Sequence, residues 1–274
     1  MKIKKKIIWL IKRHPFLYYS RFKLLSKNAT KQQTNLDTYN AINKKEDIPN
    51  LDHEINAKIF ETGIPNTDLE KAIKIAVWLL KNIKGGRGLS LSSEEVLKIM
   101  LDGKGGVCSD IAQVFNNFCV INDIKVKEWG ITTIPFNRNY GGHSANEIFS
   151  KELNKWVLID VSKGITIYTE NNENPLSIIE LYKANKTPAK IFYKSFIDSV
   201  KVNMSQIDNY YLNSTATPFL ISNYSNKTYD RFLNIFRPYL PVFIIHFFVF
   251  VMNKSYHYKF PLNDYRKMFE YHIN

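Results

Sequence analysis

The chain has 274 residues, 45% of them hydrophobic, and this apolar share excludes wholesale disorder. Its formal net charge is +13, but ten Lys and Arg lie in residues 1–31 and no acidic residue precedes Asp37, so the basic character belongs to a tail. Two cysteines are too few for a disulfide scaffold, and Cys108 and Cys119 are predicted to be free thiols, as in a reducing compartment.

Residues 1–56 are predicted to be a basic N-terminal extension followed by a polar linker or weakly ordered arm. The apolar run at residues 7–11 is too short for the core of a signal peptide, which favours a cytoplasmic protein. Basic residues flank Ile, Trp and aromatic residues up to residue 27, so this segment is predicted either to lie on an anionic membrane surface or to pack on its own protein or on a partner. Nucleic acid is disfavoured as a partner because no zinc-finger, helix-turn-helix or RNA-binding signature is present.

Two helices are predicted ahead of the first cysteine. The sequence Thr67-Asp68-Leu69-Glu70 is a capping box, and an amphipathic helix is expected to run from it to about residue 85. A second capping box at residues 92–95 begins a short helix that ends near Gly103. A third helix is predicted to start close to Cys108, because apolar residues recur after it at helical spacing: Ile111, Val114, Phe115, Phe118 and Ile121.

The position of Cys108 favours a reactive thiolate. In the first turn of a helix, the unpaired backbone N–H groups and the helix dipole lower the pKa of a thiol. The same N–H groups are suited to hold the oxyanion that forms when a carbonyl is attacked. The glycines at 103, 105 and 106 allow a loop or a substrate to approach the backbone closely. Cys119, among Phe residues, is predicted to be a buried packing residue.

A β-hairpin is predicted to bring His143 and Asp160 together. Residues 144–149 and 155–160 both have the composition of short strands. If the loop comprises residues 150–153, Phe149 pairs with Asn154 and His143 lies directly opposite Asp160, within reach of a hydrogen bond. Asp160 would fix the tautomer of His143, and His143 would accept the proton of Cys108. Helices followed by antiparallel strands, including one at residues 126–134, indicate an α+β fold with the cysteine helix packed on the sheet.

Three local patterns resemble the transglutaminase-like superfamily of papain-like cysteine enzymes: Gly106-Val107-Cys108-Ser109-Asp110, His143-Ser144-Ala145-Asn146-Glu147-Ile148-Phe149 and Trp156-Val157-Leu158-Ile159-Asp160. The resemblance covers residues 67–182 and implies a core at 57–184, with Cys108 as nucleophile, His143 as general base and acid, and Asp160 as the orienting carboxylate. Ala145 stands where members of the family often carry Trp, and no upstream side chain matches an oxyanion-stabilising residue.

The remaining chain, residues 185–274, is rich in aromatic residues and is predicted to complete or flank the core. Before it, a helix is expected from Pro175 with Asn174 as its cap. The apolar run at 239–252 is short for a membrane-spanning helix, so a buried core segment is favoured over an interfacial or re-entrant one. His246 in that run is predicted to be a hydrogen-bonded core histidine.

Two functions follow from these patterns. In the first, the protein is a cysteine protease or amidase, or an acyltransferase, which acts through an acyl-enzyme intermediate on a peptide or another substrate that carries an amide or ester. In the second, it is a catalytically inactive binding module of this fold, peripheral to a membrane. No metal or cofactor is expected, because no pair of His residues has chelating helical spacing and neither glycine-rich segment fits a phosphate-binding loop.

Overall fold

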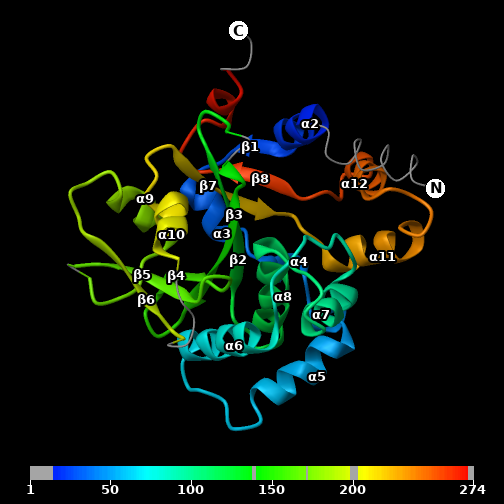
Figure 1. Cartoon of the computed structure of the whole chain (residues 1–274), viewed down its shortest axis with the longest axis horizontal. Helices are drawn as coiled ribbons and strands as arrows, with labels where there is room; N and C mark the ends of the chain where they lie inside the picture. The colour runs from blue at the N-terminus through cyan, green and yellow to red at the C-terminus, as the bar shows by residue number, and fades with distance from the viewer. Residues whose placement is uncertain (1–14, 138–139, 171, 198–202, 271–274) are drawn as a thin grey trace.

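The computed structural model describes residues 15–137, 140–170, 172–197 and 203–270 (Figure 1). The basic and apolar run at residues 1–14, predicted to contact a membrane or to pack on protein, lies outside these residues.

An eight-stranded sheet forms the centre of the described structure (Figure 1). Its strands are β1 (Ser26–Asn28), β2 (Val126–Thr133), β3 (His143–Ser150), β4 (Lys155–Asp160), β5 (Ile165–Thr169), β6 (Ile191–Ser195), β7 (Ala216–Ser222) and β8 (His257–Phe260). Their order is β1-β8-β7-β2-β3-β4-β5-β6, and every neighbouring pair is antiparallel except β1 and β8. The predicted α+β class is therefore confirmed, and the sheet takes strands from each of the three predicted segments of the chain.

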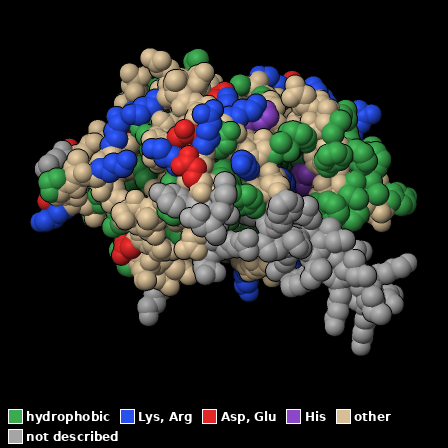
Figure 2. All heavy atoms as spheres, turned by 90° about the horizontal axis from the view of Figure 1, so that it is seen from above, with side chains coloured by type: hydrophobic (Ala, Val, Ile, Leu, Met, Phe, Trp, Pro, Cys, Tyr) green, Lys and Arg blue, Asp and Glu red, His purple; other side chains and the backbone are tan. Residues whose placement is uncertain are grey.

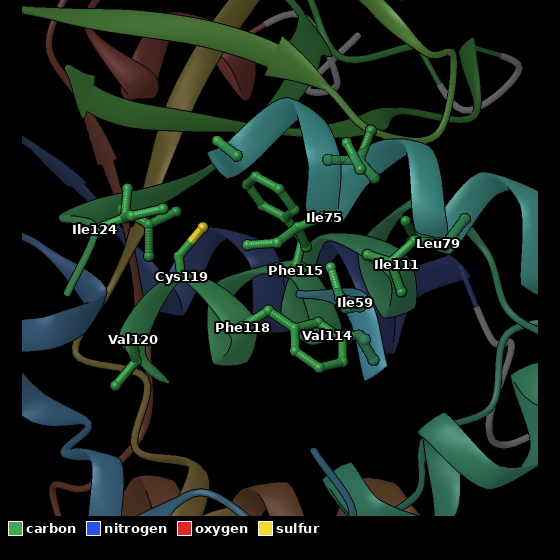
Figure 3. Packing of buried hydrophobic residues seen from close by; sticks show 14 of the residues in the cluster. Ile59, Ile75, Leu79, Ile111, Val114, Phe115, Phe118, Cys119, Val120 and Ile124 are labelled. Atoms are coloured by element: carbon green, nitrogen blue, oxygen red, sulfur yellow. The ribbon is translucent and has the colours of Figure 1, made fainter. Parts of the chain in front are cut away.

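One face of the sheet packs on the helix that carries Cys108. This helix, α8 (Cys108–Ile121), contacts β2 and β3, as the sequence predicted. It is surrounded by α5 (Asn50–Ile59), α6 (Asp68–Asn82) and α7 (Ser93–Leu101). Phe115, Phe118 and Cys119 are fully buried at the centre of this cluster (Figure 3). Burial of one such aromatic side chain contributes about 1.5–3 kcal/mol, so α8 is held rigidly against the sheet.

Capping explains where these helices begin. Thr67 and Glu70 form both hydrogen bonds of a capping box, and α6 starts at the next residue, Asp68. Ser92 is the N-cap of α7, but its hydroxyl donates to the Glu95 carboxylate instead of accepting from the backbone. Both predicted helix starts are therefore confirmed, although the second lacks the hydrogen bonds of a capping box.

Two helices cover the opposite face of the sheet, α9 (Ile178–Ala184) and α10 (Met204–Tyr211). The prediction that α9 begins at Pro175 is wrong, because Ser177 and Glu180 form the capping box. The backbone before it hydrogen-bonds to two strands: Leu176 N–H donates to Ile167 O at 2.7 Å, and Leu158 N–H donates to Leu176 O at 2.8 Å. The carbonyl of Leu176 is therefore engaged by β4 and does not take part in a helix.

Residues 28–56 are not the polar linker or weakly ordered arm that their composition predicted. They form α3 (Lys31–Leu36), α4 (Tyr39–Ile42), a 3-10 turn (Lys45–Asp47) and α5, and α2 (Pro15–Leu25) precedes them. Two of their asparagines donate hydrogen bonds to distant backbone carbonyls: Asn40 Nδ2 to Ile124 O at 2.9 Å, and the buried Asn43 Nδ2 to Tyr224 O at 2.9 Å. Some polar side chains of this segment are therefore hydrogen-bonded to the backbone of distant segments, and amino-acid composition alone does not distinguish them from solvated side chains.

After β6 and α10, the C-terminal region adds β7 and β8 to the sheet and two helices, α11 (Asn226–Phe236) and α12 (Val242–Val251), before a 3-10 turn (Tyr265–Met268). The apolar run at 239–252 is only partly buried: Val242, Ile245 and Val249 face the protein, while other side chains of α12 are exposed. His246 lies beside the Tyr229 ring, and among the described residues its buried Nδ1 atom does not make the hydrogen bond predicted for a core histidine. None of the helices in the described residues has the length and apolarity needed to cross a membrane.

Candidate active site

Cys108 occupies the first position of α8, with Val107 in an extended conformation as the N-cap. Asp110 organises this helix start, because its carboxylate accepts Val107 N–H at 2.9 Å and Leu89 N–H at 3.3 Å. Cys108 is partly exposed whereas Cys119 is buried, and both are free thiols. The predictions that Cys108 lies in the first turn of a helix and that Cys119 is buried are therefore confirmed.

The loop before Cys108 is held by a second backbone segment. Gly86 N–H donates to Gly106 O at 2.7 Å, and Gly106 N–H donates to Arg87 O at 2.9 Å. A Cβ on Gly105 would lie 2.6 Å from Leu89 Cδ2 and 3.1 Å from the Arg87 carbonyl oxygen, so the Leu89 side chain would have to move and the backbone contact would be tight. Gly106 has a φ of +112°, which other residues rarely adopt. The glycines thus permit close backbone contact that fixes the position of Cys108.

His143 begins β3, Asp160 ends β4, and His143 Nε2 lies 2.7 Å from Asp160 Oδ2. The two side chains are 2% and 0% exposed. The predicted register is wrong by two residues: Ser150 pairs with Lys155 and Phe149 with Trp156. The cause is Asn154, which adopts a φ of +48° and belongs to the turn instead of pairing with Phe149.

The predicted contact between His143 and Asp160 is correct despite the register error, because side chains in a strand alternate between the two faces of the sheet. A register shifted by two residues keeps His143 and Asp160 on the same face of the sheet. They become diagonal neighbours instead of directly opposed ones, and side chains as long as imidazole still reach across that separation. The sequence therefore predicted the contact correctly but the pairing incorrectly.

Cys108 and His143 form the other contact of the site. Two groups lie close enough to the Cys108 sulfur to stabilise its thiolate by hydrogen bonding, the His143 ring and the Ser144 backbone N–H. Because Nε2 of His143 is engaged by Asp160, Nδ1 is the atom left for the thiol. Burial disfavours the thiolate, but these hydrogen bonds and the charge of the imidazolium outweigh it, so the pKa of Cys108 is lowered.

The pKa of His143 shifts in the complementary direction. Burial disfavours the imidazolium, but the charge and hydrogen bond of Asp160, with a contribution from Cys108, raise its pKa to about 9. Burial likewise disfavours the Asp160 carboxylate, and the charge of His143 together with several hydrogen bonds lowers its pKa instead. The arrangement thus favours three charged groups side by side, a thiolate, an imidazolium and a carboxylate, and the central imidazolium stabilises both anions.

Two tyrosines at the end of α10, which no sequence pattern predicts to be part of the site, also contact the His143–Asp160 pair. The Tyr211 hydroxyl donates to Asp160 Oδ2 at 2.9 Å, and the Tyr210 ring stacks on His143 with centroids 4.2 Å apart. Asp160 Oδ1 also accepts the Ser162 hydroxyl at 2.9 Å and the Lys163 N–H at 3.0 Å. Of these contacts, only those of Ser162 and Lys163 could be predicted from the local sequence Asp-x-Ser-Lys, because a Ser two residues after an Asp commonly hydrogen-bonds to its carboxylate in a turn.

A second carboxyl group is buried near the sulfur. Glu128 on β2 is 4% exposed and accepts the Asn116 amide at 3.3 Å. Burial, followed by the charge of Cys108, raises its pKa to about 8. Glu128 is therefore largely protonated at neutral pH, in contrast to Asp160.

No cluster of three or more His, Cys, Asp and Glu side chains is placed to bind a metal ion within the described ranges. Glu147, on the same strand as His143, is engaged elsewhere: its carboxylate accepts Trp129 Nε1–H at 2.8 Å and Ile178 N–H at 2.7 Å. Trp129 pairs with Ala145 across β2 and β3, so a Trp ring reaches this part of the sheet from the neighbouring strand.

The chain matches no protein-family model and no curated protein sequence. Among solved structures it is similar to a protein named "Putative Cysteine Protease from Cytophaga hutchinsonii", with 16% sequence identity and a TM-score of 0.32. The alignment covers 61% of this chain and 56% of that chain, so the chain spans little more than half the length of the protein it matches. At this level of similarity, the roles of residues follow only from this chain's own geometry.

Proposed function

We propose that the protein is a thiol enzyme that hydrolyses an amide or ester, or transfers its acyl group to an amine. Cys108 is the nucleophile, His143 the general base and acid, and Asp160 the orienting carboxylate. The observation that supports this most directly is the position of the His143 ring, which hydrogen-bonds to Asp160 and lies beside the Cys108 sulfur.

The chemistry follows from these contacts. The proton of the Cys108 thiol passes to His143, and the thiolate attacks the carbonyl carbon of the substrate. His143 then donates this proton to the leaving amine or alcohol as the carbon–nitrogen or carbon–oxygen bond breaks, which leaves an acyl group on the sulfur. Water or an amine attacks the thioester, loses its proton to His143 and releases the thiol. Asp160 stabilises the imidazolium during both steps.

The oxyanion of the tetrahedral intermediate needs hydrogen-bond donors close to the sulfur. The backbone N–H of Cys108 is suited to this role, because an N–H in the first turn of a helix has no acceptor within the helix. Such donors act in a partly buried site, where they contribute more than in water. We assign the oxyanion to this N–H and to the positive end of α8.

Acylation by an aryl acetate ester tests the proposal. The wild-type protein and a Ser109→Ala control, altered one residue further along the same turn, are expected to release one equivalent of phenolate in a burst and to carry an acetyl group on Cys108. Cys108→Ala is expected to show neither and to keep its melting temperature. Full ester turnover by Cys108→Ala would refute the enzyme hypothesis. A wild-type protein that shows neither burst nor acetylation would instead favour the inactive binding module.

A further inference from the structure

One side of α12 carries large apolar side chains in contact with solvent. Its exposed residues, the α12 face, are Phe247 (59% exposed), Phe248 (42%), Val251 (64%) and Met252 (53%). Ile235 and Tyr239, at and after the end of α11, are also exposed. Figure 2 shows hydrophobic side chains gathered at one end of the molecule, with Lys and Arg side chains near them. Contiguous exposed apolar surface of this kind marks a contact site.

A basic cavity lies beside the α12 face. It has a volume of about 620 Å³, and its charged lining residues are Arg21, Arg87, Lys104 and Arg237. Val242, Phe243 and His246 of α12 form part of its wall, and no acidic residue of the described chain lines it. Phe243 is one helical turn from Phe247, so the apolar wall of the cavity continues into the α12 face.

Three of the four cations that line this cavity form no salt bridge with the described residues. Within the described residues, no salt bridge involves Arg21, Arg87 or Arg237, whereas Lys104 pairs with Asp102 at 2.8 Å. Arg237 Nε donates to the backbone carbonyl of Ser90 at 3.0 Å, which fixes its guanidinium at the rim. Cations that share a cavity repel one another, and an anion between them relieves this repulsion.

We propose that α12 and the basic cavity form a docking surface for an anionic lipid membrane. The α12 face enters the interface between headgroups and acyl chains, and Arg21, Arg87 and Arg237 contact lipid phosphates. An interfacial helix combines these two features, an apolar face and adjoining cations. Charge complementarity selects the membrane over a second copy of this chain, because two such surfaces would bring their unpaired cations together.

Sedimentation of the full-length protein with phospholipid vesicles tests this surface. The protein is expected to bind vesicles of phosphatidylcholine that contain phosphatidylserine, and not those of phosphatidylcholine alone. Phe247→Ser is expected to lower the partition coefficient about tenfold, because the burial of a Phe side chain in an apolar phase is lost. Arg87→Gln is expected to lower it about fivefold, since each cation near an anionic surface contributes a factor of that size.

Matched controls separate this surface from general effects. Ile64→Ser removes an equally exposed apolar side chain, 66% exposed, and Lys190→Gln removes an exposed cation on the far edge of the sheet. Both are expected to bind like the wild type. Cys108→Ala should also bind normally, so this proposal and the proposed function can fail separately. Equal binding to neutral vesicles, or binding that Phe247→Ser leaves unchanged, would overturn the proposal. A dimer that Phe247→Ser dissociates, without vesicle binding by the wild type, would assign the α12 face to self-association instead.

Discussion

Asp160→Asn tests the electrostatic argument for the site most directly. The substitution keeps the shape of the side chain and an acceptor for Tyr211, but it removes the negative charge beside His143. Burial alone disfavours the imidazolium, and the carboxylate is the main reason that the pKa of His143 is about 9. Without the carboxylate, that pKa should fall to its ordinary value of about 6.5 or below.

The size of this effect follows from the pKa. A fall from about 9 to about 6.5 corresponds to about 3.4 kcal/mol of lost stabilisation of the imidazolium. The thiolate of Cys108 depends on that imidazolium, because the hydrogen bond and charge of His143 oppose the effect of burial on the thiol. At pH 8 the imidazolium fraction should fall from about 90% to about 3%, so the thiolate that pairs with it should decrease about thirtyfold.

The assay is alkylation of the protein by iodoacetamide between pH 5 and pH 10, followed at each cysteine by mass spectrometry. Cys119 is an internal control, since it is 0% exposed and reacts only when the fold opens. Tyr211→Phe removes one hydrogen bond from Asp160 but keeps the charge, so it should reduce the rate at pH 8 much less. A rate for Asp160→Asn at pH 8 that equals the wild-type rate would refute this account of the site.

Two further predictions concern stability. Glu128→Gln should raise the melting temperature more at pH 8 than at pH 5. The pKa of Glu128 is about 8 in the folded protein and about 4.5 in the unfolded chain, so the wild type loses stability as the pH rises from about 4.5 to about 8. An equal gain at both pH values, in thermal melts, would contradict this. Gly106→Ala should lower the free energy of unfolding in urea by about 1–3 kcal/mol, because φ is +112°. Gly88→Ala, whose Cβ meets Val107 at an ordinary 3.5 Å, is the control and should cost less.

Local patterns in the sequence predicted the parts of the fold that local hydrogen bonds determine. The Thr67 capping box is one case, because Thr67 and Glu70 satisfy each other's backbone N–H groups whatever surrounds them. Another is the start of α8 at Cys108, which follows glycines and precedes an apolar periodicity. The His143–Asp160 contact could also be predicted, since the alternation of side chains tolerates a register error of two residues.

Other parts of the site depend on packing between distant segments, which no local pattern records. Tyr211 reaches Asp160 from 51 residues away because α10 packs on the same face of the sheet, and nothing in its own sequence indicates this. The polar composition around Asn40 and Asn43 predicts a linker, because Asn is most often exposed to solvent. Their partners, the backbone of Ile124 and Tyr224, become apparent only in three dimensions.

The two buried carboxyl groups near Cys108 differ in charge because their hydrogen-bond partners differ. Asp160 accepts hydrogen bonds from His143, Tyr211 and Ser162, and these keep it ionised despite complete burial. Glu128 accepts one long hydrogen bond from Asn116, and burial keeps it protonated. A charged Glu128 would repel the thiolate and raise the pKa of Cys108. Asp160 is therefore ionised where its charge stabilises the imidazolium, and Glu128 is protonated where a charge would destabilise the thiolate.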